Sequence, residues 1–132
     1  DWYDQVYLSS DQWLDTCYPY CYDDISLGTE SIATQTPLAP DGSYSITKTF
    51  TLPNTGNYYN NLPENSYLIF ATDQGSQQGE TNENNNLKIV PIKLQKPDLV
   101  VTDATAPIQA DNGSTISVSW TVKNQGTVPA NA

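Results

Sequence analysis

The sequence contains no histidine among its 132 residues, and this absence narrows the chemistry open to it. Histidine is the commonest general base and transition-metal ligand, and it is the usual partner of a nucleophilic Ser or Cys. Hydrolysis by a pair of carboxylates needs no histidine, so it remains formally open. Nothing else in the sequence supports it, and we therefore expect no enzymatic activity.

Positive charge is also scarce, with five Lys and Arg against 15 Asp and Glu and a net charge of −10. Such a surface repels phosphate backbones and anionic lipid headgroups, so we expect neither nucleic-acid nor membrane-surface binding. No apolar run is long enough for a membrane-spanning helix, so we expect no membrane insertion. The acidic surface is compatible with calcium binding, and equally with solubility alone.

Cysteine is nearly absent, and the only two are Cys17 and Cys21, with three residues between them. One Cys pair without histidine is too few ligands for zinc, and the spacing is not that of redox motifs. We expect a disulfide that closes this short turn in an oxidising compartment, and two free thiols are the alternative. Abundant Asn, Thr, Ser, Tyr and Asp with little Lys favour a secreted or cell-surface protein.

No apolar pattern of helical period persists, and short strands between turn residues take its place. The predicted strands are residues 6–8, 44–52, 66–71, 87–94, 99–101 and 116–123. Turns are predicted at Pro40-Asp41-Gly42-Ser43 and Asp111-Asn112-Gly113, and Pro91 predicts an edge position or a bulge. The pattern indicates an all-β fold, an antiparallel β-sandwich of Ig-like type.

Three motifs carry a resemblance to a known family. Lys96-Pro97-Asp98-Leu99-Val100-Val101 leads into a strand that contains Trp120-Thr121-Val122-Lys123-Asn124-Gln125-Gly126. The second motif is Trp2-x-Asp4-x-Val6-Tyr7-Leu8-Ser9, and the third is the Asn- and Glu-rich stretch 80–86. Together they resemble the CARDB family, the cell-adhesion-related domain found in bacteria, which implies an Ig-like sandwich and a role in extracellular structure.

The order of these motifs is cyclically shifted relative to the family, in which the PDL and W-x-V-x-N strands come first. We therefore expect residues 1–95 to carry the later strands of one domain and residues 96–132 the first strands of the next, as one period of a tandem array. Closure of the chain on itself is disfavoured, because three linker residues reach only about 10 Å while the poles of a sandwich lie about 25 Å apart. The C-terminal strands should then complete a neighbouring unit.

The expected interface between successive units is the apolar face of the C-terminal strands. It comprises Leu99, Val101, Ile116, Val118, Trp120 and Val122. The partner is another copy of the same unit, joined head to tail, either by covalent continuation or by strand donation between separate molecules.

Two acidic stretches are candidate calcium sites. The candidate ligands are Asp11, Asp15, Asp23, Asp24, Asp73, Glu80, Asn82 and Glu83. Carboxylates crowded into one loop repel each other unless a cation or hydrogen-bond donors neutralise them, and calcium takes several hard oxygen ligands. The alternative is that these side chains accept backbone N–H groups in turns.

Taken together, the sequence predicts a structural repeat subunit of an extracellular bacterial filament, sheath or adhesive surface protein. The alternative is a carbohydrate-binding module of a secreted protein, because nine Tyr and three Trp could stack on surface sugars. An aromatic residue exposed near a turn, such as Trp13, also fits a protein interface.

Overall fold

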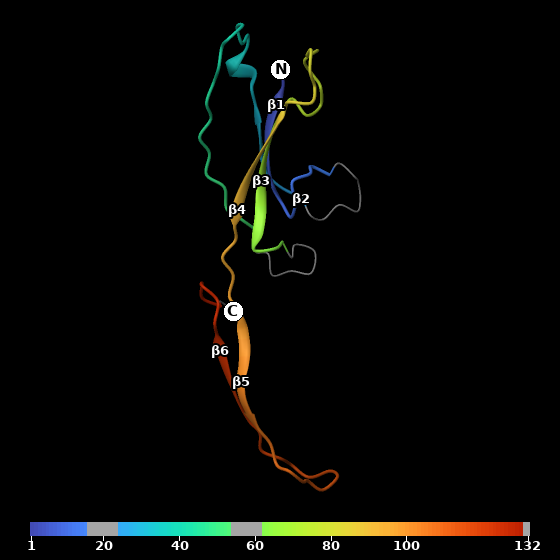
Figure 1. Ribbon diagram of the computed structural model, residues 1–132, viewed down its shortest axis with the longest axis vertical. Coiled ribbons are helices and arrows are strands. Elements are labelled where there is room, and N and C mark those ends of the chain that lie inside the picture. The colour runs from blue at the N-terminus through green and yellow to red at the C-terminus, as the bar shows by residue number, and fades with distance from the viewer. Residues whose placement is uncertain (16–23, 54–61, 131–132) are drawn as a thin grey trace. The chain divides into compact units, whose positions relative to one another are not determined.

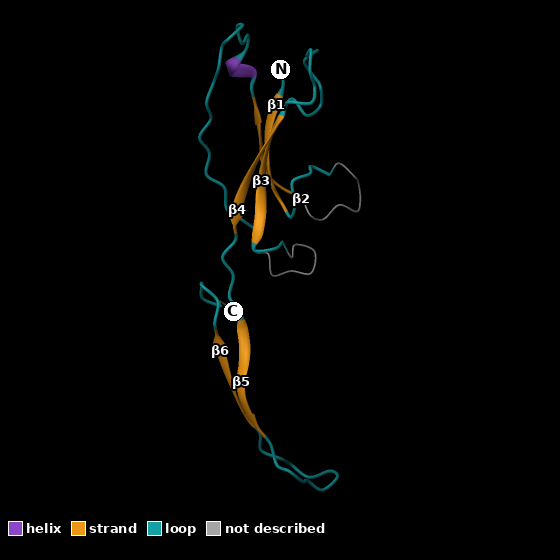
Figure 2. Cartoon of the chain, viewed as in Figure 1, coloured by secondary structure: helices purple, strands orange, loops and turns teal. Residues whose placement is uncertain are grey.

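The computed structural model describes residues 1–15, 24–53 and 62–130, and almost all of its regular structure is β. The elements in chain order are β1 (Tyr3–Ser9), β2 (Asp24–Ser31), the 3₁₀ turn η1 (Ala33–Gln35), β3 (Asn65–Thr72), β4 (Leu87–Lys93), β5 (Leu99–Thr105) and β6 (Ser119–Asn124), as Figures 1 and 2 show. Every strand pair is antiparallel, which confirms the predicted all-β, antiparallel fold class. No helix in the described part of the chain is long and apolar enough to cross a membrane.

The chain divides into two compact units, Asp1–Leu94 and Gln95–Ala132. Unit 1 is a four-stranded sheet in the order β2-β1-β3-β4. Unit 2 is the two-stranded hairpin β5-β6. The break follows the end of β4 and lies beside Lys96-Pro97-Asp98, where the sequence predicts a boundary between residues 95 and 96.

The main apolar cluster of unit 1 lies on one face of its sheet, near the end of β1, and Ile69 and Ala71 are buried on the opposite face. Leu8, Leu62 and Leu94 are buried there, and Ile25, Leu27, Leu68 and Ile92 pack against them. Leu8 on the central strand β1 pairs with Ile25 on one side and Leu68 on the other. Because directly paired residues share a face, these side chains form one apolar layer.

Strand β2 was not predicted, and its sequence explains why. Asp24-Ile25-Ser26-Leu27-Gly28-Thr29-Glu30-Ser31 has few β-branched residues and two acidic ones. The strand forms because it pairs along the whole of β1, with a register shift that places Leu27 in a bulge opposite the Val6–Tyr7 step. Pairing with a distant strand thus outweighs a weak local preference.

Strand β4 is at the edge of the sheet, and this confirms the interpretation of Pro91. Proline has no N–H to donate, so it is tolerated where one side of a strand lacks a partner. Pro91 lies opposite Tyr67 of β3 in the ladder, and β4 has no strand on its other side in the four-stranded order.

The prediction of a strand over residues 44–52 is wrong. These residues belong to no ladder, and Figure 2 draws them as a loop beside the strands. Among the residues that the structure describes, their backbone groups form no hydrogen bond with another backbone. The alternating sequence is typical of a strand, but no strand among the described residues pairs with it.

In unit 2, the strand predicted over residues 116–123 is shorter at its start and runs Ser119–Asn124. Its partner β5 ends at Thr105 and is followed by Ala106-Pro107. Because Pro107 has no N–H, it cannot extend the ladder toward Ile116. The predicted turn at Asp111-Asn112-Gly113 is present, with Gly113 at φ 85° and the Ser114 N–H donating to the Asp111 carbonyl over 3.0 Å.

Candidate functional site

The hairpin of unit 2 carries an exposed apolar face. The register pairs Val101 with Val122 and Ala104 with Trp120, so these side chains share one face with Leu99. We call Leu99, Val101, Trp120 and Val122 the hairpin face. These four residues, together with Ile116 and Val118 just before β6, are between 48% and 65% exposed. The hairpin of unit 2 therefore does not bury any of the six predicted interface residues itself.

The end of the hairpin is held together by Asn124 and Gly126. The Asn124 side-chain oxygen accepts the N–H groups of Asp98 and Gly126, each over 3.0 Å, and its amide nitrogen donates to the Val128 carbonyl. A Cβ on Gly126 would lie 2.5 Å from the Lys96 carbonyl oxygen, so only glycine fits. This gives a physical reason for the Asn-x-Gly spacing that follows Trp120 and Val122.

Unit 1 carries a hollow of about 880 Å³ on the same face of the sheet as its core. Strands β1, β2, β3 and β4 contribute residues to it, and residues 44–50 form a wall. Val6, Phe70 and Gly28 line it and share one face, because Val6 pairs with both of the others. Phe70 is 42% exposed within this hollow, so the apolar layer that buries Leu8 is left uncovered here.

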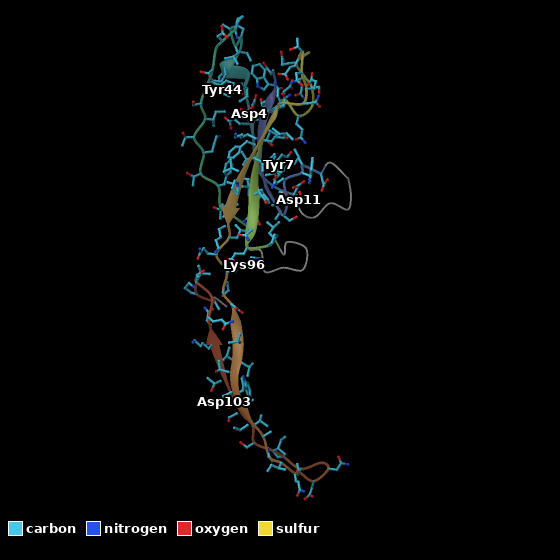
Figure 3. All side chains as sticks on the ribbon, viewed as in Figure 1. Asp4, Tyr7, Asp11, Tyr44, Lys96 and Asp103 are labelled. Carbon is cyan, nitrogen blue, oxygen red and sulfur yellow. The ribbon has the colours of Figure 1, made fainter. Side chains whose placement is uncertain are left out.

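A hydrogen-bond network anchors one end of segment 44–52 to the sheet. Figure 3 labels two of its members, Tyr44 and Asp4. The Tyr44 hydroxyl donates to the Asp4 carboxylate over 2.9 Å and accepts the Trp2 indole N–H over 3.3 Å. Thr72 donates its hydroxyl to the same carboxylate over 2.7 Å. Burial is the largest cause that raises the pKa of Tyr44 above 10.0, and the neighbouring Asp4 charge adds to it.

Two further contacts hold the second half of the same segment against the sheet. Lys48 forms an ion pair with Glu30 of β2 over 2.6 Å, with both side chains partly exposed. The Phe50 ring lies against the backbone of Gly28, where a Cβ would be 2.9 Å from the ring. Tyr44, Lys48 and Phe50 therefore point toward the sheet, with the alternation that the sequence predicts for a strand.

The first acidic stretch is described only in part. Asp11 accepts the Trp13 N–H over 2.7 Å, and Asp24 accepts the Asp15 N–H over 2.6 Å. The Asp11 contact closes a turn, which is the alternative to calcium binding that the sequence leaves open. Asp23, Cys17 and Cys21 lie outside the described residues, so their predicted roles stay predictions.

The second acidic stretch forms a loop built on Asp73, which is only 2% exposed. Its two carboxylate oxygens accept the N–H groups of Gln77 and Gln78 over 2.8 and 2.7 Å. Asp73 itself has a left-handed backbone at φ 45°, and its N–H donates to the Tyr3 carbonyl. The carboxylate thus organises the turn after β3.

The remaining predicted ligands of this stretch bond within the loop. Glu83 accepts the Glu80 N–H, Asn82 accepts the Asn84 N–H, and Glu80 accepts the Asn86 side-chain amide. In the described ranges, no three acidic or Cys side chains come together as a metal-binding group. Calcium binding by these residues stays a prediction.

The sequence reasoning missed Phe70, Gly28 and Asp4 as parts of a site. Phe70 lies in an apolar run, which favours a buried position. The signal that could have found the site is the alternation of residues 44–52. It places a Tyr, a Lys and a Phe on one face of the segment, and such a face is expected to contact a sheet.

Comparison of the chain with protein-family models, with curated proteins and with solved structures finds no match.

Proposed function

We propose that this chain is a structural repeat subunit of an extracellular bacterial filament, sheath or adhesive surface protein, and that successive units assemble head to tail by strand completion. The observation that carries the proposal is the exposed hairpin face of unit 2. A two-stranded hairpin is marginally stable in water by itself, and three or more strands or a covering layer are needed for independent stability.

The chemistry of this face favours a protein partner of similar kind. Trp120 is 65% exposed, and a large aromatic side chain is the type of residue that dominates interface energetics once it is buried. Contiguous apolar surface of this sort marks interaction sites in soluble proteins. A covering sheet from another unit would bury the hairpin face as the core of a sandwich is buried.

The motifs support the same function. The PDL and W-x-V-x-N-x-G segments resemble the opening strands of a CARDB domain, and here they follow the motifs that resemble its later strands. A domain whose opening strands come from the preceding unit links each unit to the next, and repetition of one such contact produces a linear array. The scarcity of Lys and the abundance of Asn, Thr and Ser support an extracellular location.

The test is the mass of the native protein under denaturing, reducing conditions, followed by its mass under native conditions. A denatured mass many times 14.5 kDa indicates a covalent tandem array. A denatured mass near 14.5 kDa with a much larger native mass indicates separate subunits joined by donated strands. A monomer under both conditions contradicts the proposal.

A carbohydrate-binding module is the second candidate, and it rests on Trp13, which is 74% exposed. An exposed indole offers a flat apolar surface on which a sugar ring can stack. A titration of the intrinsic tryptophan fluorescence with soluble cell-surface polysaccharide distinguishes the two functions. A saturable shift that Trp13→Ala abolishes and Trp120→Ala retains favours carbohydrate binding.

A further inference from the structure

We propose that the hollow of unit 1 is the acceptor for the hairpin of a second copy of this chain, and that segment 44–52 pairs with the free edge of β6 to form a second sheet. This inference rests on the proposed function and assigns the site on which strand completion takes place.

The acceptor unit offers backbone groups without backbone partners as well as an exposed apolar surface. Segment 44–52 runs as a loop beside the strands (Figure 2), Tyr44, Lys48 and Phe50 contact the sheet, and in the described residues its N–H and C=O groups have no backbone partner. Extended backbone with unpaired groups is a template for an added strand. Because Tyr44, Lys48 and Phe50 hold the segment over the sheet, a strand added to its edge would lie over the same face.

The donor hairpin likewise offers a strand edge for pairing and an exposed apolar face. In its two-stranded sheet β6 pairs with β5 along one edge, and among the described residues no strand pairs with its other edge. The hairpin face consists of aliphatic and indole side chains, and the hollow has Val6 and the half-exposed Phe70 on its floor. One docking event would therefore satisfy two backbone edges and bury two apolar surfaces.

The distribution of charge favours a second copy joined head to tail. Unit 1 holds twelve Asp and Glu and three Lys, for a net charge of −9. Unit 2 holds three Asp and two Lys, for a net charge of −1. Contact between two copies of unit 1 is strongly repulsive, whereas the nearly neutral hairpin approaches unit 1 with little repulsion.

The test uses one variant on each side, with a matched control for each. Trp120→Asp places a charge on the hairpin face, and Ser119→Asp places the same charge on the opposite face of β6. Phe70→Asp places a charge in the hollow. Tyr3→Asp is its control, because Tyr3 is 46% exposed and, three positions before Val6 in β1, lies on the opposite face of the sheet.

The chain and both controls should assemble to multiples of 14.5 kDa in analytical ultracentrifugation. Trp120→Asp and Phe70→Asp should each raise the concentration for half-assembly about thirty-fold or more, as expected for loss of an interface hot spot. An equimolar mixture of the two variants should form pairs and nothing larger, because only one intact donor and one intact acceptor are present.

Hydrogen exchange on the unmodified chain provides a second measurement that does not depend on a variant folding correctly. Dilution should expose the amides of residues 44–52 and of β6, and concentration should protect both together. Protection of these amides in a monomer would show that the hairpin closes on its own chain, and that result overturns the proposal.

The remaining outcomes separate this inference from the proposed function. If Trp120→Asp prevents assembly while Phe70→Asp assembles like the unmodified chain, the hairpin docks elsewhere and only the acceptor assignment fails. If neither substitution affects assembly, strand completion through the hairpin fails as well.

Discussion

Asp4 joins segment 44–52 to the sheet through its side-chain carboxylate. It accepts hydrogen bonds from Tyr44 and from Thr72, which are 40 and 68 positions away in the sequence. Tyr44 in turn accepts the Trp2 indole N–H, and the two rings lie 6.5 Å apart. A hydrogen bond to a charged acceptor is stronger than a neutral one, so this contact holds the segment in place.

Substitution Tyr44→Phe should lower the free energy of unfolding of unit 1 by about 1 kcal/mol, because the hydrogen bond to a carboxylate is lost in a partly exposed setting. Urea denaturation followed by circular dichroism measures the change. Tyr3→Phe is the control, since Tyr3 is about half exposed at 46%. Equal losses in the two variants would contradict a specific role for the Tyr44 hydroxyl.

Alkaline pH should act through the same residue. Burial, aided by Asp4, raises the pKa of Tyr44, and burial together with Asp24 raises that of Tyr7. Above pH of about 10, the unfolded chain loses phenol protons that the folded chain retains, so stability is constant below that pH and falls above it. The fall, measured by urea denaturation between about pH 8 and pH 11, should be less steep in Tyr44→Phe than in the unmodified chain.

Among the elements, segment 44–52 depends on the bare backbone of Gly28 in β2. A Cβ at this position would lie 2.9 Å from the Phe50 ring, so the ring would have to move away from the sheet. Gly28→Ala should therefore lower stability by about 1 kcal/mol, at the low end of overpacking costs because the segment can shift. Thermal unfolding measures this, and Gly79→Ala, with no atom within 4 Å of its Cβ position, should leave it unchanged.

The loop after β3 is an element held by one buried carboxylate. Asp73→Ala removes the acceptor for the Gln77 and Gln78 N–H groups and should cost about 2 kcal/mol. If hydrogen bonding alone is responsible, the loss is the same in calcium and in EDTA. A loss that appears only with calcium, measured by differential scanning calorimetry, would instead support the predicted calcium site.

For the whole molecule, the net charge of −10 opposes association of any two copies. The proposed assembly is driven by apolar burial, so salt should strengthen it by screening this repulsion. The concentration for half-assembly, measured by light scattering, should fall between about 10 mM and 150 mM NaCl, as the Debye length shortens from about 30 to 8 Å. Weaker assembly in salt would indicate that ion pairs hold the units together.

The sequence by itself determined the features that depend on neighbouring residues. The Pro40-Asp41-Gly42 turn follows from local chemistry: Asp41 has φ 60°, and the Gly42 N–H donates to the Ala39 carbonyl over 2.8 Å. The edge position of Pro91 follows from its missing N–H, and the hairpin face follows from alternation along β5 and β6. The four residues of the hairpin face could be placed together in advance because side-chain direction in a strand has a period of two.

Only the tertiary structure decided which extended segments have partners. β2 becomes a strand because β1 pairs with it, whereas residues 44–52, with the better strand pattern, have no backbone partner among the described residues. The hollow exists because Val6, Gly28 and Phe70 meet from three strands. The physical reason is that the pattern of a strand determines which face it buries. Which strand it pairs with depends on the other segments, far apart in the chain, that compete to form the same ladder.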